Sequence, residues 1–165
     1  MKLKIIFIAL LISLLFACRQ KKADFSIKAP KDWIVVDTVS GEQERSVSMH
    51  PPVYTKIPAF VANINISIQH SYSTGMYMHG VVSAVKRDAF FFEDNGEGTR
   101  TLNNYNIKWE RHIMQYKQSA PRVEQKTYFI GDYNNVYMIV CTSKLHEMDK
   151  LQGKIDEVLT SFKIL

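Results

Sequence analysis

The sequence lacks the short motifs that mark the common catalytic centres. It has no G-x-S-x-G nucleophile elbow, no H-E-x-x-H zinc motif and no Walker-type phosphate loop. Its adjacent carboxylates, Glu93/Asp94 and Asp156/Glu157, do not converge on a substrate if they lie on helices, where neighbours diverge by about 100°. We therefore expect no enzyme activity and no cofactor.

Strongly basic segments and repeats are also missing. The formal net charge is only +5, and no stripe of Lys and Arg with interleaved aromatic residues occurs, so the usual signature of nucleic-acid binding is absent. The chain has no internal repeats and no low-complexity stretch. Its length is that of one domain, since domains commonly have about 100–150 residues.

The apolar block at the start of the chain is too short for a comfortable membrane span. It runs from Ile5 to Ala17, broken only by Ser13 and preceded by Lys2 and Lys4, whereas a spanning helix needs about 20 apolar residues. A basic start followed by a short apolar block is typical of a signal peptide. Residues 1–17 are predicted to be one.

The block ends in Leu15-Phe16-Ala17-Cys18, which resembles the lipobox of bacterial lipoproteins. Leu15, Ala17 and Cys18 match that pattern, and Phe16 is bulkier than the pattern prefers. The resemblance implies cleavage before Cys18, a diacylglyceryl thioether on its sulfur and usually a further acyl chain, such as palmitate, on the new amino terminus. The alternative is an uncleaved signal anchor with an incidental cysteine.

Lipid attachment at Cys18 implies a location in the cell envelope, on the extracytoplasmic side of the inner or outer membrane. A thiol is the side chain nucleophilic enough to take the lipid, and two or more acyl chains make anchoring stable. Residues 18–24 are then a tether, with Arg19, Lys21 and Lys22 beside anionic lipid. Cys141, the other cysteine, is left without a disulfide partner and is predicted to be a buried, inert core residue.

The rest of the chain predicts an α+β domain over residues 25–165. Ile64, Ile66 and Ile68 alternate with polar residues, which indicates a half-buried antiparallel strand. Other strands are expected at residues 25–27, 33–36, 45–49, 98–102, 107–116, 125–130 and 136–142, with turns at 94–96, 103–104 and 131–135.

Two helices are predicted by apolar residues at three- and four-residue steps. The first covers about Met76 to Phe92, with Met78, Val81, Val85, Ala89 and Phe92 on one face. The second covers about His146 to Phe162, with Leu151, Ile155, Val158, Leu159 and Phe162 on one stripe. Strands with one inserted and one closing helix predict an antiparallel sheet covered by helices.

This order of strands and helices, together with two sequence patterns, resembles the PsbP family of the photosynthetic oxygen-evolving complex and its bacterial relatives. The two patterns are Phe25-x-Ile27-x-x-Pro30-x-x-Trp33 and Ile155-x-x-Val158-Leu159-x-Ser161-Phe162. The resemblance implies an α-β-α sandwich that serves mainly as a binding or assembly module. It supplies no catalytic residues for this chain and does not imply a photosynthetic role.

The sequence therefore favours a lipid-anchored envelope protein with a non-catalytic binding or assembly domain, partnered by the membrane and by an envelope protein. One alternative is copper handling, because Met and His side chains suit copper(I); the weak candidates are His50, His79 and Met148. Against it, the helical pattern points Met78 inward and His79 away. A second alternative is an envelope enzyme, which requires a pocket with convergent polar residues.

Phe90 is a candidate partner surface. Three consecutive phenylalanines, residues 90–92, cannot share one face of a helix. If the helix continues to Phe92, that residue joins the core and Phe90 points outward, where an exposed aromatic can mark an interface. The alternative is that the helix ends before Phe91 and the chain turns inward.

Overall fold

The computed structural model describes residues 24–40, 44–52, 62–70 and 73–165. The predicted signal peptide, the lipobox with Cys18, and the tether up to residue 23 lie outside the described residues. Within the described ranges, no helix has both the length and the apolar character needed to cross a membrane.

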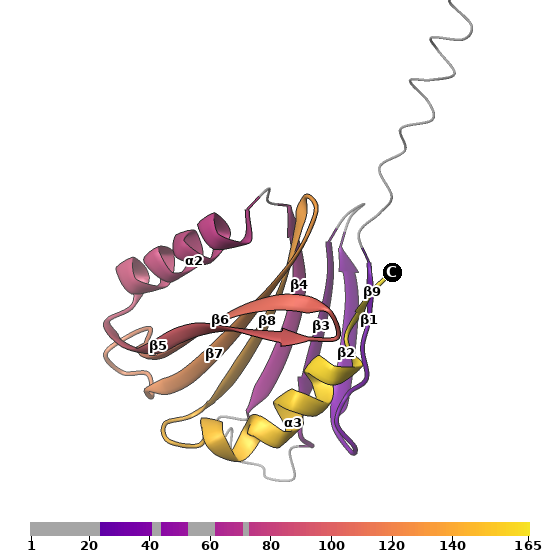
Figure 1. Ribbon diagram of the computed structural model, residues 1–165. Helices are drawn as coiled ribbons and strands as arrows, with labels where there is room; N and C mark the ends of the chain where they lie inside the picture. Colours follow the sequence, from indigo (N-terminus) through magenta and orange to yellow (C-terminus); the bar gives the residue numbers. More distant parts are fainter. Residues whose placement is uncertain (1–23, 41–43, 53–61, 71–72) are drawn as a thin grey trace, which may run out of the picture.

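Seven strands form one antiparallel sheet in the order β2-β3-β4-β8-β7-β6-β5 (Figure 1). They are β2 (Ile34–Ser40), β3 (Glu44–His50), β4 (Asn63–His70), β5 (Phe91–Leu102), β6 (Tyr105–Gln115), β7 (Val123–Asp132) and β8 (Asn135–Lys144). A separate pair, β1 (Phe25–Ser26) and β9 (Lys163–Ile164), joins the two ends of the domain. Strands β2 and β5 are therefore the two edges of the large sheet.

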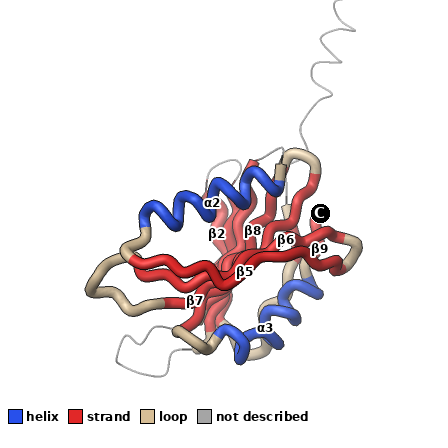
Figure 2. The backbone as a smooth tube through the Cα atoms, turned by 60° about the vertical axis from the view of Figure 1, so that its left-hand side comes forward, coloured by secondary structure: helices blue, strands red, loops and turns tan. Residues whose placement is uncertain are grey.

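Two helices cover opposite faces of this sheet (Figure 2). Helix α3 (Met148–Ser161) packs Ile155 and Val158 into the cluster that contains Tyr128, and α2 (Thr74–Asp88) packs Met78 against Phe129. Tyr128 and Phe129 are neighbours on β7, so their side chains point to opposite faces. The predicted α-β-α arrangement of an α+β fold is confirmed.

The strand pattern follows the sequence where polar and apolar residues alternate. Ile64, Ile66 and Ile68 are buried, as expected. Asn103 and Asn104 have φ values of 52° and 67° between β5 and β6, which is the left-handed geometry of a type I′ hairpin turn. The loop between β7 and β8 is shorter than predicted, because β7 continues to Asp132 and β8 begins at Asn135.

The first helix is shorter than its apolar pattern predicts. It ends at Asp88, Ala89 is extended, and the Phe90 N–H donates to the Gln115 carbonyl at 2.8 Å. The chain thus enters β5, and Phe92 belongs to that strand and not to the helix stripe. The predicted turn at 94–96 is a bulge inside β5, where Gly96 has a φ of 109°.

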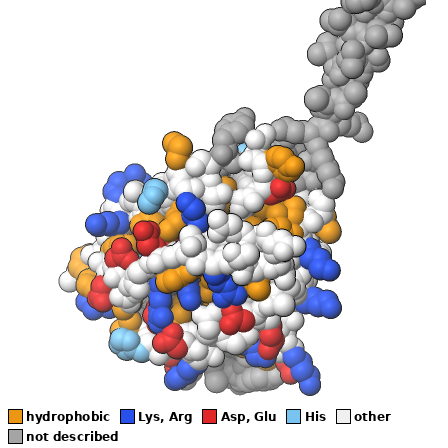
Figure 3. All heavy atoms as spheres, viewed as in Figure 1, with side chains coloured by type: hydrophobic (Ala, Val, Ile, Leu, Met, Phe, Trp, Pro, Cys, Tyr) orange, Lys and Arg blue, Asp and Glu red, His pale blue; other side chains and the backbone are white. Residues whose placement is uncertain are grey.

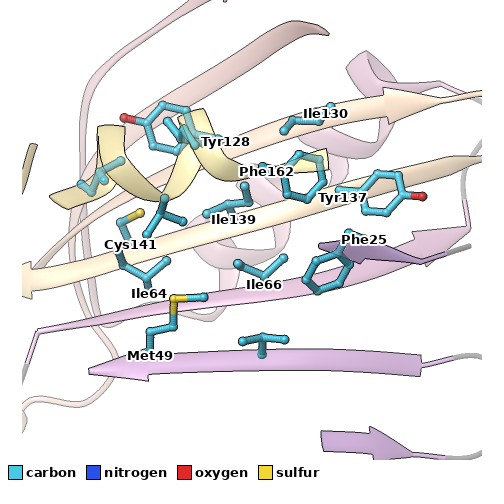
Figure 4. Close-up of a cluster of buried hydrophobic side chains, with 14 of the residues drawn as sticks. Phe25, Met49, Ile64, Ile66, Tyr128, Ile130, Tyr137, Ile139, Cys141 and Phe162 are labelled. Atoms are coloured by element: carbon cyan, nitrogen blue, oxygen red, sulfur yellow. The ribbon is translucent and has the colours of Figure 1, made fainter. Parts of the chain in front are cut away.

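An aromatic cluster closes the core beside the β1–β9 pair (Figure 4). The Phe25 ring stacks on Phe162 with centroids 5.8 Å apart and meets Tyr137 edge-on at 6.2 Å. Cys141 is fully buried in the same cluster, and burial raises the pKa of its thiol far above the ordinary value. Among the described residues, the buried apolar side chains lie between Phe25 and Phe162, so a chain that begins at Arg19 retains all of them.

We expect Phe162→Ala to lower the free energy of unfolding by about 3–5 kcal/mol, because the substitution empties the centre of this cluster. Phe90→Ala is the matched control, since Phe90 is 59% exposed and should change stability by about 0.5 kcal/mol or less. Urea unfolding followed by circular dichroism measures both. Equal losses in the two variants would show that Phe162 does not close the core.

Candidate functional site

The edge strand β2 exposes apolar side chains along its length. Its exposed fractions are 45% for Ile34, 47% for Val35, 51% for Val36 and 60% for Val39. Among the described strands β2 pairs only with β3, so its outer row of backbone N–H and C=O groups has no strand partner there. We call these four side chains and this outer row the β2 edge.

The apolar side chains of the β2 edge lie on both faces of the sheet. Val35 is opposite the buried Met49, which faces the α3 side, and Val36 is opposite Ser48 on the other side. A strand that packs one face on a core carries apolar residues on that face alone. Apolar residues exposed on both faces of an edge mark a surface that pairs with another chain.

The opposite edge of the sheet, β5, is different. Its exposed residues are polar over the central stretch, at Glu93, Asp94, Asn95, Glu97, Thr99 and Thr101. The bulge between Asp94 and Glu97 interrupts its register with β6. Charges and bulges are the devices that keep an edge from pairing with other chains, so β5 is protected and the β2 edge is open.

The single charge on β2 is neutralised by Arg45. The Arg45 guanidinium contacts both carboxylate oxygens of Asp37, at 3.1 and 2.7 Å, and Asp24 Oδ1 at 2.7 Å. It also lies 4.7 Å from the Phe25 ring centroid. The hydrogen bonds from Arg45 lower the pKa of Asp37. The same guanidinium therefore joins the start of the described chain to the middle of the β2 edge.

A buried polar pair on β6 is the second unusual feature. Glu110 and His112 are 4% and 1% exposed, and His112 Nδ1 lies 3.8 Å from Glu110 Oε2. His112 Nε2 is 3.2 Å from Gln125 Oε1, but His112 Nδ1 and Glu110 Oε1 have no hydrogen-bond partner among the described residues. Within the described ranges, no serine, cysteine or threonine side chain is hydrogen-bonded to either member of the pair, which is the contact expected between a nucleophile and its base.

The Glu110–His112 pair was not singled out from the sequence. The available signal is Glu110-x-His112-x-Met114 within a predicted strand, because alternate residues of a strand share one face. Which face is buried depends on where α2 packs, and the strand pattern alone does not contain that information.

The weak metal candidates do not come together. His50 ends β3 and its Nδ1 lies 2.9 Å from the Pro51 carbonyl, His79 is exposed on α2, and Met148 is fully buried at the start of α3, on the other side of the sheet. The described ranges contain no group of three or more His, Cys, Asp or Glu placed to hold a metal ion. Met78 is buried and His79 exposed, as the helical pattern predicts, and both line a 200 Å³ hollow together with Lys108.

Two further open hollows have linings that do not include Glu110 or His112. One of 640 Å³ is lined by Lys28, Asp156 and Glu157, and one of 460 Å³ by Asn103, Tyr105 and Thr160.

Positive and negative side chains are mixed on the face shown in Figure 3. Phe90, the predicted partner surface, is exposed at the opposite edge of the sheet from β2.

Comparisons with known proteins show the fold and not a family. No family model matches the sequence, and no curated protein matches it in a sequence search. Several solved structures share its fold, and three of them have sequence identities of 9–11% to this chain.

The first of these is LpqN of Mycobacterium tuberculosis, described as involved in cell envelope biogenesis, with a TM-score of 0.63 and 11% identity over 89% of this chain and 86% of LpqN. The second is the cyanobacterial PsbP of Synechocystis, with a TM-score of 0.55 and 11% identity over 89% of this chain and 96% of the other. The third is PA94 of Pseudomonas aeruginosa, a protein of unknown function, with a TM-score of 0.59 and 9% identity over 83% and 94%. The chain thus has a PsbP-like α-β-α fold.

Proposed function

We propose that this chain is a lipid-anchored protein of the cell envelope whose domain is a non-catalytic binding module, and that it binds a partner protein at the β2 edge. The observation that carries the proposal is the row of exposed apolar side chains on an edge strand that has no outer strand neighbour among the described residues. The fold neighbour LpqN, described as involved in cell envelope biogenesis, supports an envelope role.

Strand addition is the binding mode that fits this surface. In that mode an extended segment of the partner pairs with the free backbone groups of an edge, and its alternate side chains supply specificity. Ile34 and Val36 face one side and Val35 and Val39 the other, and Asp37 is neutralised by Arg45. The complementary segment is therefore extended, apolar on both faces and uncharged at its centre.

The position of the β2 edge relative to the anchor indicates where the partner is held. Asp24 contacts Arg45, which contacts Asp37 of β2, each at 2.7 Å. Asp24 is six positions after Cys18, and a chain spans at most about 3.6 Å per residue, so Cys18 lies within about 22 Å of Asp24. A lipid on Cys18 would keep the edge near a bilayer, so we propose an envelope protein held at that same membrane.

The anchor is tested by labelling cells with radioactive palmitate. Cys18→Ser should abolish incorporation and block cleavage before residue 18, because the thiol is the acceptor of the lipid. Cys141→Ala is the matched control and should be labelled as strongly as the natural chain. Continued labelling of Cys18→Ser, or an unlabelled natural chain that keeps its first 17 residues, contradicts the lipoprotein assignment.

The binding edge is tested by adding charge to one edge of the sheet at a time. Val36→Lys with Val39→Lys should remove at least nine-tenths of the partner captured from detergent-solubilised native membranes, because lysine on an edge strand opposes strand addition. Asn95→Lys with Thr101→Lys adds the same charge to exposed positions of β5 and should leave capture unchanged. Unfolding curves confirm that both variants remain folded.

Two results overturn the edge assignment. One is equal capture by the β2 variant and the natural chain. The other is equal loss in the β2 and β5 variants, which would mean that added positive charge, and not the β2 edge, controls binding.

A further inference from the structure

A second exposed apolar surface, built from aromatic side chains, lies where α2 passes into β5. Phe90 and Tyr116 are each 59% exposed. The Phe90 N–H donates to the Gln115 carbonyl at 2.8 Å, and Phe91 is the register partner of Gln115, so Phe90 and Tyr116 flank the same end of the β5–β6 pair. This end belongs to the protected edge of the sheet, across from β2 (Figure 1).

The loop that follows β6 is fixed against this end. The Gln115 side-chain amide donates to the carbonyls of Gln118 and Ala120 at 3.0 and 2.7 Å. The Arg122 guanidinium lies 3.8 Å from the Phe91 ring centroid, a cation–π distance. We call Phe90, Phe91, Tyr116 and Arg122 the aromatic end. The loop beside its exposed rings is therefore held in place by hydrogen bonds.

Basic side chains flank the aromatic end. Lys86 and Arg87 are exposed in the last turn of α2, and Lys117 and Arg122 are exposed in the loop after β6. The nearby carboxylates are Asp88, which pairs with Arg87 at 2.8 Å, and the exposed Glu93 and Asp94 of β5. Outside the Arg87–Asp88 pair, three cations stand against two carboxylates, so the surface near the two exposed rings has a small positive surplus.

We propose that the aromatic end docks on an anionic lipid surface. Aromatic rings settle at the headgroup level of a bilayer, and nearby Lys and Arg are attracted to anionic lipid. A protein partner for two projecting rings would have to offer pockets matched to them, whereas a fluid bilayer accommodates them without such pockets. Phe90 and Tyr116 line none of the three hollows described above.

This contact is separate from the proposed lipid on Cys18 and from the β2 edge. It is therefore measured on a chain that begins at Arg19, which retains the buried side chains between Phe25 and Phe162 and has neither the predicted signal peptide nor Cys18. Co-sedimentation is compared between vesicles of phosphatidylcholine with phosphatidylglycerol and vesicles of phosphatidylcholine alone. We expect binding to the anionic vesicles, weakened by added salt because the attraction is electrostatic.

Three variants distinguish binding through the aromatic end from non-specific hydrophobic adsorption and measure the contribution of one positive charge. Phe90→Ser with Tyr116→Ser should abolish most of the binding, whereas Met76→Ser with Tyr133→Ser, which removes two large side chains exposed by 77% and 95% elsewhere, should leave it unchanged. Lys117→Gln should lower the partition coefficient about five-fold, the loss expected for one cation at an anionic surface.

The proposal is overturned if the Arg19 chain does not bind the anionic vesicles, or if both double variants bind as the natural sequence does. It is also overturned if the Phe90/Tyr116 variant binds vesicles normally but loses a protein captured from membranes, which would make the aromatic end a protein interface. None of these results bears on the palmitate labelling of Cys18 or on capture at β2.

Discussion

The central constraint on this structure is that the two edge strands of its sheet have, on one side, backbone hydrogen-bonding groups without a partner among the described strands. Each strand inside the sheet has its N–H and C=O groups paired on both sides, and the two edges do not. The β5 edge carries polar residues and a bulge between Asp94 and Glu97, which discourage pairing. Strand β2 has no bulge in its pairing with β3, its single charge on Asp37 is paired with Arg45, and it exposes Ile34, Val35, Val36 and Val39. The asymmetry between the edges leaves one side of the domain ready for another strand.

The first described residues connect this open edge to the body of the domain. Phe25 packs in the aromatic cluster with Phe162 and Tyr137, and β1 pairs with β9, so both ends of the domain are held at one place. Arg45 lies over the Phe25 ring and bonds Asp24 and Asp37. The aromatic end, around Phe90 and Tyr116, is at the other edge, so the two proposed contacts do not compete.

Local pattern predicted much of the fold. Three elements follow from residues that are close together in the sequence. The strand at Ile64, Ile66 and Ile68 and the last helix follow from the spacing of their apolar residues. The turn at Asn103–Asn104 follows from the ability of asparagine to adopt a positive φ. The end of α2 did not follow, because the helical period continues to Phe92 and no Gly or Pro lies between Val81 and Phe92. The candidate sites depend on tertiary order. Ile34 to Val36 look like core residues until β2 is placed at an edge, and Glu110 and His112 become a buried pair only once α2 covers their face.

The claim that the β2 edge is a binding surface is tested most directly by cross-linking in living cells. A photoreactive amino acid replaces Val36 in one strain and Thr101, exposed on β5, in another. The account predicts that illumination joins the Val36 chain to one discrete envelope protein and leaves the Thr101 chain without that adduct. No adduct at Val36, or the same adducts at both positions, would contradict it.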